Sequence, residues 1–412
     1  MKQTMRKRRL KLIIAVIVML FAGIIYAWSI TNNPFMQTTN GSVVNATQLG
    51  VNYTITIVFF CIGGFLAGLF SKQTTASLRF VISAVMLFTS FLASSFQIVT
   101  LPYTENYFML YMAYGVLGGL GIGIAYVTVI STVNLWFPEK RGFSSGIMLM
   151  GFGFSLLLIG RVVDILGKSE SIGWRTTYVI IAIALGLIFL LAAIVIKPPP
   201  GNTVFPKPKL SKDTETKETI KNYTALEMIK RPSFILSFIY ISILASSGSA
   251  AISFAKDIML DVDASENLAV TAVGMLGVSN GLGRLTSGWL FDKYKIRKTQ
   301  FISSIIAFLA PLTVVLALFT SSIIIGFAGL CLCCFSYGFA PTTSSVLASE
   351  FYGPKNFPLN FSILTLILIP APFAALLAGS IKSSTDSFIT AFIVLTALTI
   401  VGFFINRAIR KP

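Results

Sequence analysis

The chain has 412 residues, of which 55% are hydrophobic and only 11% are charged. Soluble domains carry about 25% charged residues, so this composition excludes a soluble fold and indicates that the lipid bilayer is the solvent. The net charge of +17 does not indicate nucleic-acid binding, because the Lys and Arg residues lie in short loops between apolar runs, as in a membrane protein. The chain has no histidine, which removes the usual metal ligand and the usual proton relay.

Twelve apolar runs follow one another along the chain, each long enough to cross a bilayer. The first follows a basic start and resembles a secretory signal, but its length and the eleven later runs indicate a membrane helix. We therefore predict an all-α integral membrane protein with spans at 12–30, 48–70, 79–99, 107–136, 143–166, 174–196, 233–255, 268–291, 299–319, 322–349, 357–380 and 386–406.

One long polar insert, residues 197–232, interrupts this series. Its Pro, Lys, Glu and Thr content predicts a solvated cytoplasmic linker between two six-helix halves, residues 1–196 and 233–412. The halves echo each other, because the tripeptide that starts at Gly123 recurs loosely at Gly338, 215 residues later. Two parallel six-span repeats are the plan of major facilitator transporters.

The loops predict the orientation. Of the 32 Lys and Arg residues, 26 fall on the side of the membrane that holds the amino terminus. Positive charge marks the cytoplasmic side, so we expect both termini in the cytoplasm and a multi-pass protein of the plasma or inner membrane. The opposite loops carry only four basic residues, Lys168, Arg175, Lys256 and Lys382.

Arg284 lies inside the apolar run 268–291, eight residues before the charges resume at Asp292. That spacing places it roughly 12 Å inside the helix end. A charged side chain at this depth costs at least about 2.5 kcal/mol and normally faces a bundle interior or a water-filled path. Asn280 lies one turn away on the same side. We predict that Arg284 and Asn280 form one wall of an anion-binding site.

Other basic, acidic and sulfur-containing residues within the spans favour structural roles. Arg161 is the rival basic site, but it approaches the outer interface, where it can reach water or pair with Asp164. Cys331, Cys333 and Cys334 indicate buried packing, since no histidine or second cysteine pair completes a metal site. We expect no metal, no cofactor and no disulfide framework.

The segment from Gly288 to Lys298, GWLFDKYKIRK, resembles the helix-to-helix loop signature of the major facilitator superfamily. Gly288, Asp292 and Lys293 are its characteristic residues, and Asp292 would act as a charged latch on a neighbouring helix end or arginine. The alternative is that Asp292 and Lys293 are merely solvated. The corresponding turn of the first half, residues 68–73, lacks the aspartate, so any latch is one-sided.

The segment 118–153, GGLGIGIAYVTVISTVNLWFPEKRGFSSGIMLMGFG, resembles the oxalate/formate antiporter family of the same superfamily, as do shorter pieces at 23–29, 173–175 and 227–232. The resemblance implies exchange or uptake of small carboxylates. It also implies site roles for Arg284, Tyr26 and Tyr126. Trp28 joins these aromatic candidates, although all three could be packing residues. The family's oxalate carriers have a lysine in span eleven, where this chain has Leu368.

These observations predict a secondary transporter of small organic anions, monocarboxylates in preference to dianions, that works by alternating access and as a monomer. The alternative is an exporter of drugs or other small amphiphiles. An exporter of cations needs a buried carboxylate to pair with its substrate. Away from the span ends the sequence offers no Asp or Glu, and Asp164 lies near an end. A non-transporting sensor is disfavoured because no sizeable soluble domain is present. An enzyme is disfavoured because no nucleophile–base pair is visible.

Overall fold

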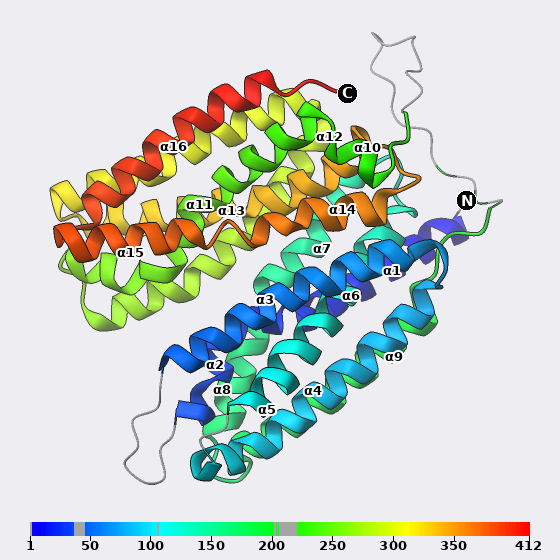
Figure 1. The fold of residues 1–412 in the computed structure, drawn as a ribbon, viewed down its shortest axis with the longest axis horizontal. Coiled ribbons are helices and arrows are strands. Elements are labelled where there is room, and N and C mark those ends of the chain that lie inside the picture. Colours follow the sequence, from blue (N-terminus) through cyan, green and yellow to red (C-terminus); the bar gives the residue numbers. More distant parts are fainter. Residues whose placement is uncertain (1, 37–45, 105–106, 202, 204, 206–220) are drawn as a thin grey trace. The chain divides into compact units, whose positions relative to one another are not determined.

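The computed structural model describes the chain except for residues 1, 37–45, 105–106, 202, 204 and 206–220 (Figure 1). The described residues are mostly helical and contain no β-strand, which confirms the predicted all-α class. Two compact units can be distinguished. Unit 1 comprises Met1–Pro138 and Gly151–Phe205, and unit 2 comprises Glu139–Met150 and Pro206–Pro412.

Unit 1 is built from long apolar helices with several local changes of helix type. The changes fall in spans one, four and five, where 3-10 or π-helical turns interrupt the α-helix. The elements are α1 (Lys2–Ala22), η1 (Gly23–Ala27), α2 (Trp28–Thr31), η2 (Asn33–Met36), α3 (Ala46–Leu69), η3 (Phe70–Lys72), α4 (Ala76–Thr104), α5 (Phe108–Leu110), the π-helical η4 (Tyr111–Gly118), α6 (Gly119–Asn134), the end of α7 (Arg141–Ser155), the π-helical η5 (Leu156–Gly160), α8 (Arg161–Lys168) and α9 (Gly173–Val195).

Unit 2 begins with the first residues of α7, so this helix is divided between the two units. Its core lies where α11, α12, α13 and α16 pack together. The elements are α10 (Ala225–Ile229), α11 (Pro232–Asp261), α12 (Glu266–Thr320), α13 (Ile323–Glu350), α14 (Phe357–Thr365), η6 (Leu366–Leu368), α15 (Phe373–Thr385) and α16 (Phe388–Ala408).

All twelve predicted spans lie mainly on helical segments, and span eleven is interrupted by a turn at residues 369–372. In the described part of the chain, ten helices are long and apolar enough to cross a membrane. One of them, α12, contains spans eight and nine, because its 55 residues are broken at Lys295, where φ is 64° and ψ is 178°. The first predicted span covers the end of α1 together with η1 and α2. We refer below to the part of α12 after Lys295 as its second arm.

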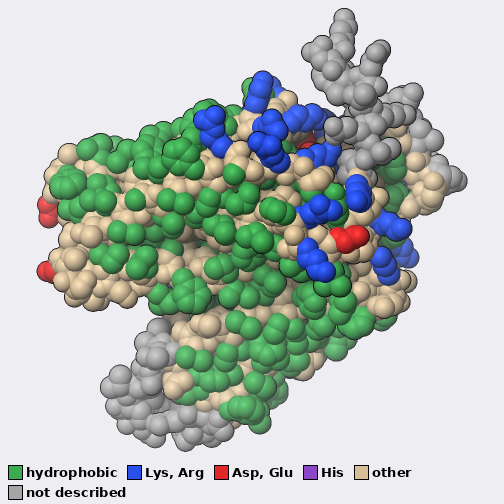
Figure 2. All heavy atoms as spheres, turned by 45° about the horizontal axis from the view of Figure 1, so that its top comes forward, with side chains coloured by type: hydrophobic (Ala, Val, Ile, Leu, Met, Phe, Trp, Pro, Cys, Tyr) green, Lys and Arg blue, Asp and Glu red, His purple; other side chains and the backbone are tan. Residues whose placement is uncertain are grey.

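The outer surface carries the apolar residues that a bilayer requires. Side chains such as Leu187, Ile194, Ile324, Phe319 and Phe404 are 63–82% exposed. Monomeric soluble proteins do not expose apolar surface on this scale. On the face shown in Figure 2, apolar side chains cover a broad area, and Lys and Arg side chains gather together beyond it. This pattern is that of a multi-pass membrane protein.

The end of the long insert belongs to unit 2 and packs against α14 and the turn before it. Tyr223 is 3% exposed, and its backbone N–H donates to the carbonyl oxygen of Tyr352 at 2.9 Å. Its own carbonyl accepts from the side-chain amides of Asn356 and Asn360 on α14, at 2.8 and 3.1 Å. The composition of the insert predicted a solvated linker throughout. One buried aromatic ring and a set of main-chain hydrogen bonds give its last residues a fixed place.

Candidate functional site

Arg284 is buried in unit 2 on the first part of α12. Its side chain is 2% exposed, and that of Asn280, one turn earlier, is 6% exposed. The Nε of Arg284 donates to Oδ1 of Asn280 at 2.8 Å, so the predicted neighbours are in direct contact. Nη1 donates to the carbonyl oxygen of Leu149 on α7 at 2.9 Å. The guanidinium is therefore held between α7 and α12.

The backbone of Arg284 is enclosed by small residues of two neighbouring helices. A Cβ at Gly146 of α7 would lie 2.6 Å from the carbonyl oxygen of Arg284, and a Cβ at Gly338 of α13 would lie 2.8 Å from its backbone nitrogen. The hydroxyl of Thr342, also on α13, donates to the same carbonyl at 3.2 Å. Close backbone packing of this kind, together with the Thr342 hydroxyl, fixes the position of Arg284 on α12.

Asp292 connects the end of span eight to the beginning of α7. Its carboxylate accepts from the backbone N–H groups of Gly142 and Phe143, at 3.0 and 2.8 Å. A carboxylate at a helix N-terminus is favourable, because the unpaired N–H groups and the helix dipole both attract negative charge. Gly288 lies against Gly142, where either Cβ would meet a backbone carbonyl of the other helix. Asp292 and Gly288 of α12 thus contact residues 142–143 of α7.

Lys293, the third residue of the loop signature, has an exposed side chain. Its ammonium lies 4.5 Å from the ring centroid of Trp289 and 4.9 Å from that of Tyr294. Such cation–π contacts are weak at an exposed site. The described contacts of Lys293 are therefore with the aromatic surface of its own helix, whereas those of Asp292 reach another helix.

The aromatic candidates all belong to unit 1. Tyr126 on α6 is 3% exposed, and its ring lies edge-on to Phe60 and Phe152, with centroids 5.2 and 5.3 Å apart. Trp28 is 6% exposed, and its indole N–H donates to the carbonyl oxygen of Leu49 at 3.1 Å. Tyr26 falls in η1, but its side chain lies outside the described residues. Substrate contacts by these residues remain a prediction.

Arg161 and Leu368 differ from Arg284 in their surroundings. Arg161 is exposed at the start of α8, and Asp164 forms its ion pair with Lys168, at 2.9 Å. Leu368 is half-buried in η6, a 3-10 turn that separates α14 from α15. No group of three or more His, Cys, Asp or Glu residues that could hold a metal ion occurs among the residues that the structure describes. The candidate site thus consists of the fixed, buried positive charge of Arg284.

The residues that enclose Arg284 on neighbouring helices were not predicted from the sequence. Leu149 accepts through its backbone carbonyl oxygen, and a backbone group cannot be recognised from a side-chain motif. Gly146 and Gly338 would contact the backbone of Arg284, and the sequence alone did not pair either glycine with that residue. The side-chain amide of Asn360 donates to the carbonyl oxygen of Tyr223.

Solved structures with the same fold are membrane transporters. The chain matches the transporter FucP in the outward conformation with a TM-score of 0.66 and 15% sequence identity, over 97% of this chain and 100% of that one. It matches the proton:xylose symporter XylE bound to 6-bromo-6-deoxy-D-glucose with a TM-score of 0.69 and 16% identity, over 100% and 97%. At these identities the likeness concerns the fold alone.

Sequence relatives are more similar. The uncharacterized MFS-type transporter YhjX of Escherichia coli is 25% identical over 88% of this chain and 85% of its own. The oxalate:formate antiporter of Oxalobacter formigenes is 25% identical over 71% and 68%, and monocarboxylate transporter 12 of Xenopus laevis is 23% identical over 81% and 73%. The family description "Major Facilitator Superfamily" matches residues 12–368. The chain belongs to the major facilitator superfamily and is a multi-pass membrane transporter, not an enzyme.

Proposed function

We propose that this transporter carries small organic anions with a single carboxylate, by alternating access, and that it exchanges one such anion for another. The observation that carries the proposal is the buried guanidinium of Arg284. An arginine held at this depth marks a functional site, since burial of its charge is costly and the fold supplies rigid packing to keep it there. Its planar fork of N–H donors matches the geometry of a carboxylate.

The relatives support the same class of substrate. Among them are a protein named for oxalate and formate and several named monocarboxylate transporters. All of these names describe carboxylates. The identities of 22–26% leave the individual substrate open, so the number of charges on it has to be argued from this chain.

The number of fixed positive charges favours a monocarboxylate. The sequence has no Lys or Arg from residue 356 to residue 381, a stretch that includes all of span eleven. At the position where the family's oxalate carriers have a lysine, Leu368 supplies an apolar side chain. A second carboxylate without a cationic partner costs several kcal/mol in a low-dielectric site. Formate-, lactate- or pyruvate-like anions are therefore favoured over oxalate-like dianions.

Exchange is favoured by the absence of the usual proton carriers. The sequence has no histidine, and the two acidic residues within predicted spans, Asp164 and Asp386, both lie at or near a span end. Without a titratable group deep in a span, coupling to a proton gradient lacks an obvious carrier. The distribution of Lys and Arg supports an orientation with both termini in the cytoplasm. We propose a monomer in the plasma or inner membrane.

Counterflow in proteoliposomes tests the proposal. Purified protein is reconstituted with unlabelled lactate inside, and uptake of labelled lactate is measured while formate, pyruvate, oxalate or an amphiphilic cation is added outside in excess. We expect each monocarboxylate to inhibit more strongly than oxalate, and the cation to have no effect. A Leu368→Lys variant should shift the preference toward oxalate.

Two outcomes of the same assay would contradict the proposal. Stronger inhibition by oxalate than by every monocarboxylate would overturn the single-charge argument. Inhibition by the cation with no response to any carboxylate would instead support the exporter alternative. Arg161→Ala is the matched control, because it removes a positive charge from an exposed position and should leave the order of the inhibitors unchanged.

A further inference from the structure

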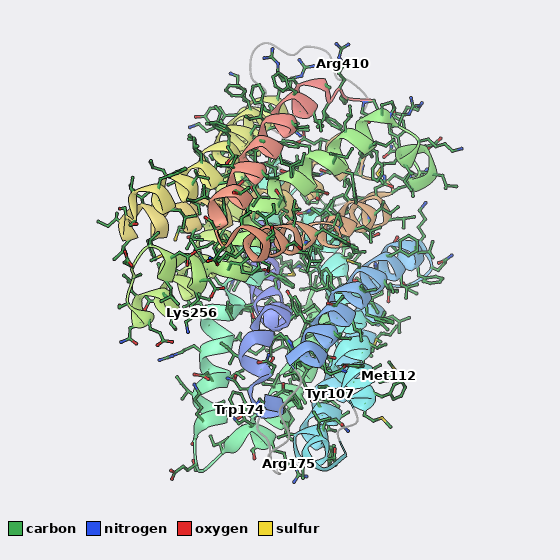
Figure 3. The ribbon with its side chains drawn as sticks, turned by 60° about the vertical axis from the view of Figure 1, so that its left-hand side comes forward. Tyr107, Met112, Trp174, Arg175, Lys256 and Arg410 are labelled. Atoms are coloured by element: carbon green, nitrogen blue, oxygen red, sulfur yellow. The ribbon has the colours of Figure 1, made fainter. Side chains whose placement is uncertain are left out.

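Exposed positive charge gathers in unit 2 where the second arm of α12 begins and α16 ends. Arg297 and Lys298 are exposed at the start of the arm, and Arg407 is exposed in the last turn of α16. Arg410 and Lys411 follow directly, also exposed, and Figure 3 shows Arg410 beyond the end of α16. The sequence contains no Asp or Glu between residues 293 and 349 or between 387 and 412, and the partly buried Glu350 interacts electrostatically with Lys411. These five cations form what we call the basic junction.

Contacts between the two helices place these cations at the same end. The side-chain amide of Asn406 donates to the hydroxyl of Ser304 at 3.1 Å, and the rings of Phe301 and Phe403 lie 5.9 Å apart. The hydroxyl of Ser304 also lies 3.0 Å from that of Tyr240, on α11. Buried polar contacts therefore hold both helix ends on a rigid base.

Exposed phenylalanines lie one helical turn from the cations on both helices. Phe301 is 50% exposed and follows Lys298 by three residues, and Phe404 is 65% exposed and precedes Arg407 by three residues. Residues three apart share a helix face. Each helix thus presents an apolar ring toward the bilayer interior and a cation on the outer side of that ring.

We propose that the basic junction binds an anionic phospholipid. The cations match the phosphate of the headgroup, and Phe301 and Phe404 match the first part of the acyl chains. Basic pockets between helices at a membrane surface are known to suit anionic headgroups. A free phosphate would satisfy the cations and leave the phenylalanines without a role, so the paired arrangement favours the lipid.

The corresponding helix ends of unit 1, at the start of α4 and the end of α9, provide a comparison with fewer arginines at the surface. There the hydroxyl of Ser77, at the start of α4, donates to the carbonyl oxygen of Ala193, near the end of α9, at 2.7 Å. Arg79 is only 8% exposed and donates to the carbonyl oxygen of Ala67 at 3.2 Å. Lys72 and Lys197 are exposed cations next to these helix ends.

Native mass spectrometry of the purified full-length protein tests the proposal with phosphatidylglycerol as the probe. The protein is titrated with phosphatidylglycerol, phosphatidylcholine or soluble glycerol 3-phosphate. We expect retained phosphatidylglycerol, little phosphatidylcholine and little glycerol 3-phosphate. The variant Arg297→Gln/Lys298→Gln/Arg407→Gln/Arg410→Gln should bind phosphatidylglycerol roughly tenfold more weakly or worse. The control Lys72→Gln/Lys197→Gln should bind it like the parent.

A charge-preserving variant, Arg297→Lys/Arg407→Lys/Arg410→Lys, guards against misfolding of the neutral one and should retain the lipid. Equal loss in the unit 1 control, or undiminished binding by the neutral variant, would overturn the site. Binding of glycerol 3-phosphate as tight as that of the lipid would replace the lipid with a soluble phosphate. The experiment measures lipid binding, so its outcome does not depend on which anion the protein transports.

Discussion

Two helix pairs, α3–α6 in unit 1 and α12–α13 in unit 2, are packed in the same way and carry different chemistry. A Cβ at Gly123 of α6 would lie 2.8 Å from the backbone nitrogen of Gly64 on α3. A Cβ at Gly338 of α13 would lie 2.8 Å from the backbone nitrogen of Arg284 on α12. The two glycines are the ones that recur 215 residues apart in the sequence.

The residues beside these glycines separate the two pairs. In unit 1, Tyr126 lies among the rings of Phe60 and Phe152. In unit 2, the guanidinium of Arg284 is bonded to Asn280 and Leu149. The comparison teaches that the repeated element is a backbone frame, in which a missing Cβ brings helices together. Each unit can then place an aromatic or a charged residue at a fixed point on that frame.

The largest expected effect comes from breaking the frame itself. Gly123→Leu and Gly338→Leu each force a side chain into the backbone of the facing helix, which cannot yield as a flexible side chain can. We expect little folded protein from either variant in size-exclusion chromatography of the solubilised membrane. Gly274→Ala, with no atom within 4 Å of its new Cβ, is the matched control and should elute like the parent. Normal elution of both leucine variants would show that the glycines are dispensable.

The next effect tests the difference in chemistry. Arg284→Ala should lower exchange by at least about a hundredfold, because a substrate carboxylate loses the buried guanidinium that the proposal assigns to it, a loss of roughly 3 kcal/mol or more. Arg284→Lys keeps the charge without the fork and should fall in between. Tyr126→Phe keeps the ring packing and should cost less than either. Normal exchange by a correctly folded Arg284→Ala protein would place the anion site elsewhere, with Arg161 as the first candidate.

A smaller effect is expected at the turns that end these helices. In unit 2, Asp292 accepts two backbone hydrogen bonds from α7, whereas the turn at residues 70–73 of unit 1 has no aspartate. Asp292→Asn keeps the shape but replaces one of the two accepting oxygens with an NH2 group, so one backbone N–H of α7 loses its acceptor, a loss of about 1 kcal/mol. We expect a melting temperature lower by about 2–4 °C. Lys293→Gln, next to it but exposed, should melt like the parent, and equal shifts in both variants would refute the specific contact.

The smallest effect concerns the end of the insert, which is fixed to unit 2. Thr224 and Glu227 cap α10 reciprocally, and the backbone N–H of Thr224, followed by its hydroxyl, lowers the pKa of Glu227. A lowered folded-state pKa contributes stability that is present above the unfolded-state pKa and lost as the pH falls through the folded-state value. The melting temperature of the parent should therefore exceed that of Glu227→Gln at pH 7, and the gap should narrow toward about pH 3. A gap independent of pH would mean that the ionised carboxylate is not the capping group.

Much of the fold could be predicted because hydropathy and helix periodicity act locally. Runs of about twenty apolar residues have to be helical in a bilayer, and charges have to lie outside it, which determined the spans and the turn that Lys295 makes in α12. The contact between Arg284 and Asn280 could also be predicted, because residues four apart on a helix are neighbours whatever the rest of the chain does.

The partners that come from elsewhere in the chain were decided only by the tertiary structure. The carbonyl of Leu149 reaches Arg284, and the backbone of residues 142–143 reaches Asp292, across about 135–150 residues of sequence. Backbone groups carry no side-chain signal, so their pairing depends on which helices pack and in which register. Tyr223 shows the same limit. The polar sequence around it predicted a solvated linker, but three hydrogen bonds to its backbone N–H and carbonyl groups fix it within unit 2. The sequence placed the charge in the membrane, and the packing of α7 and α13 around α12 decided what holds it there.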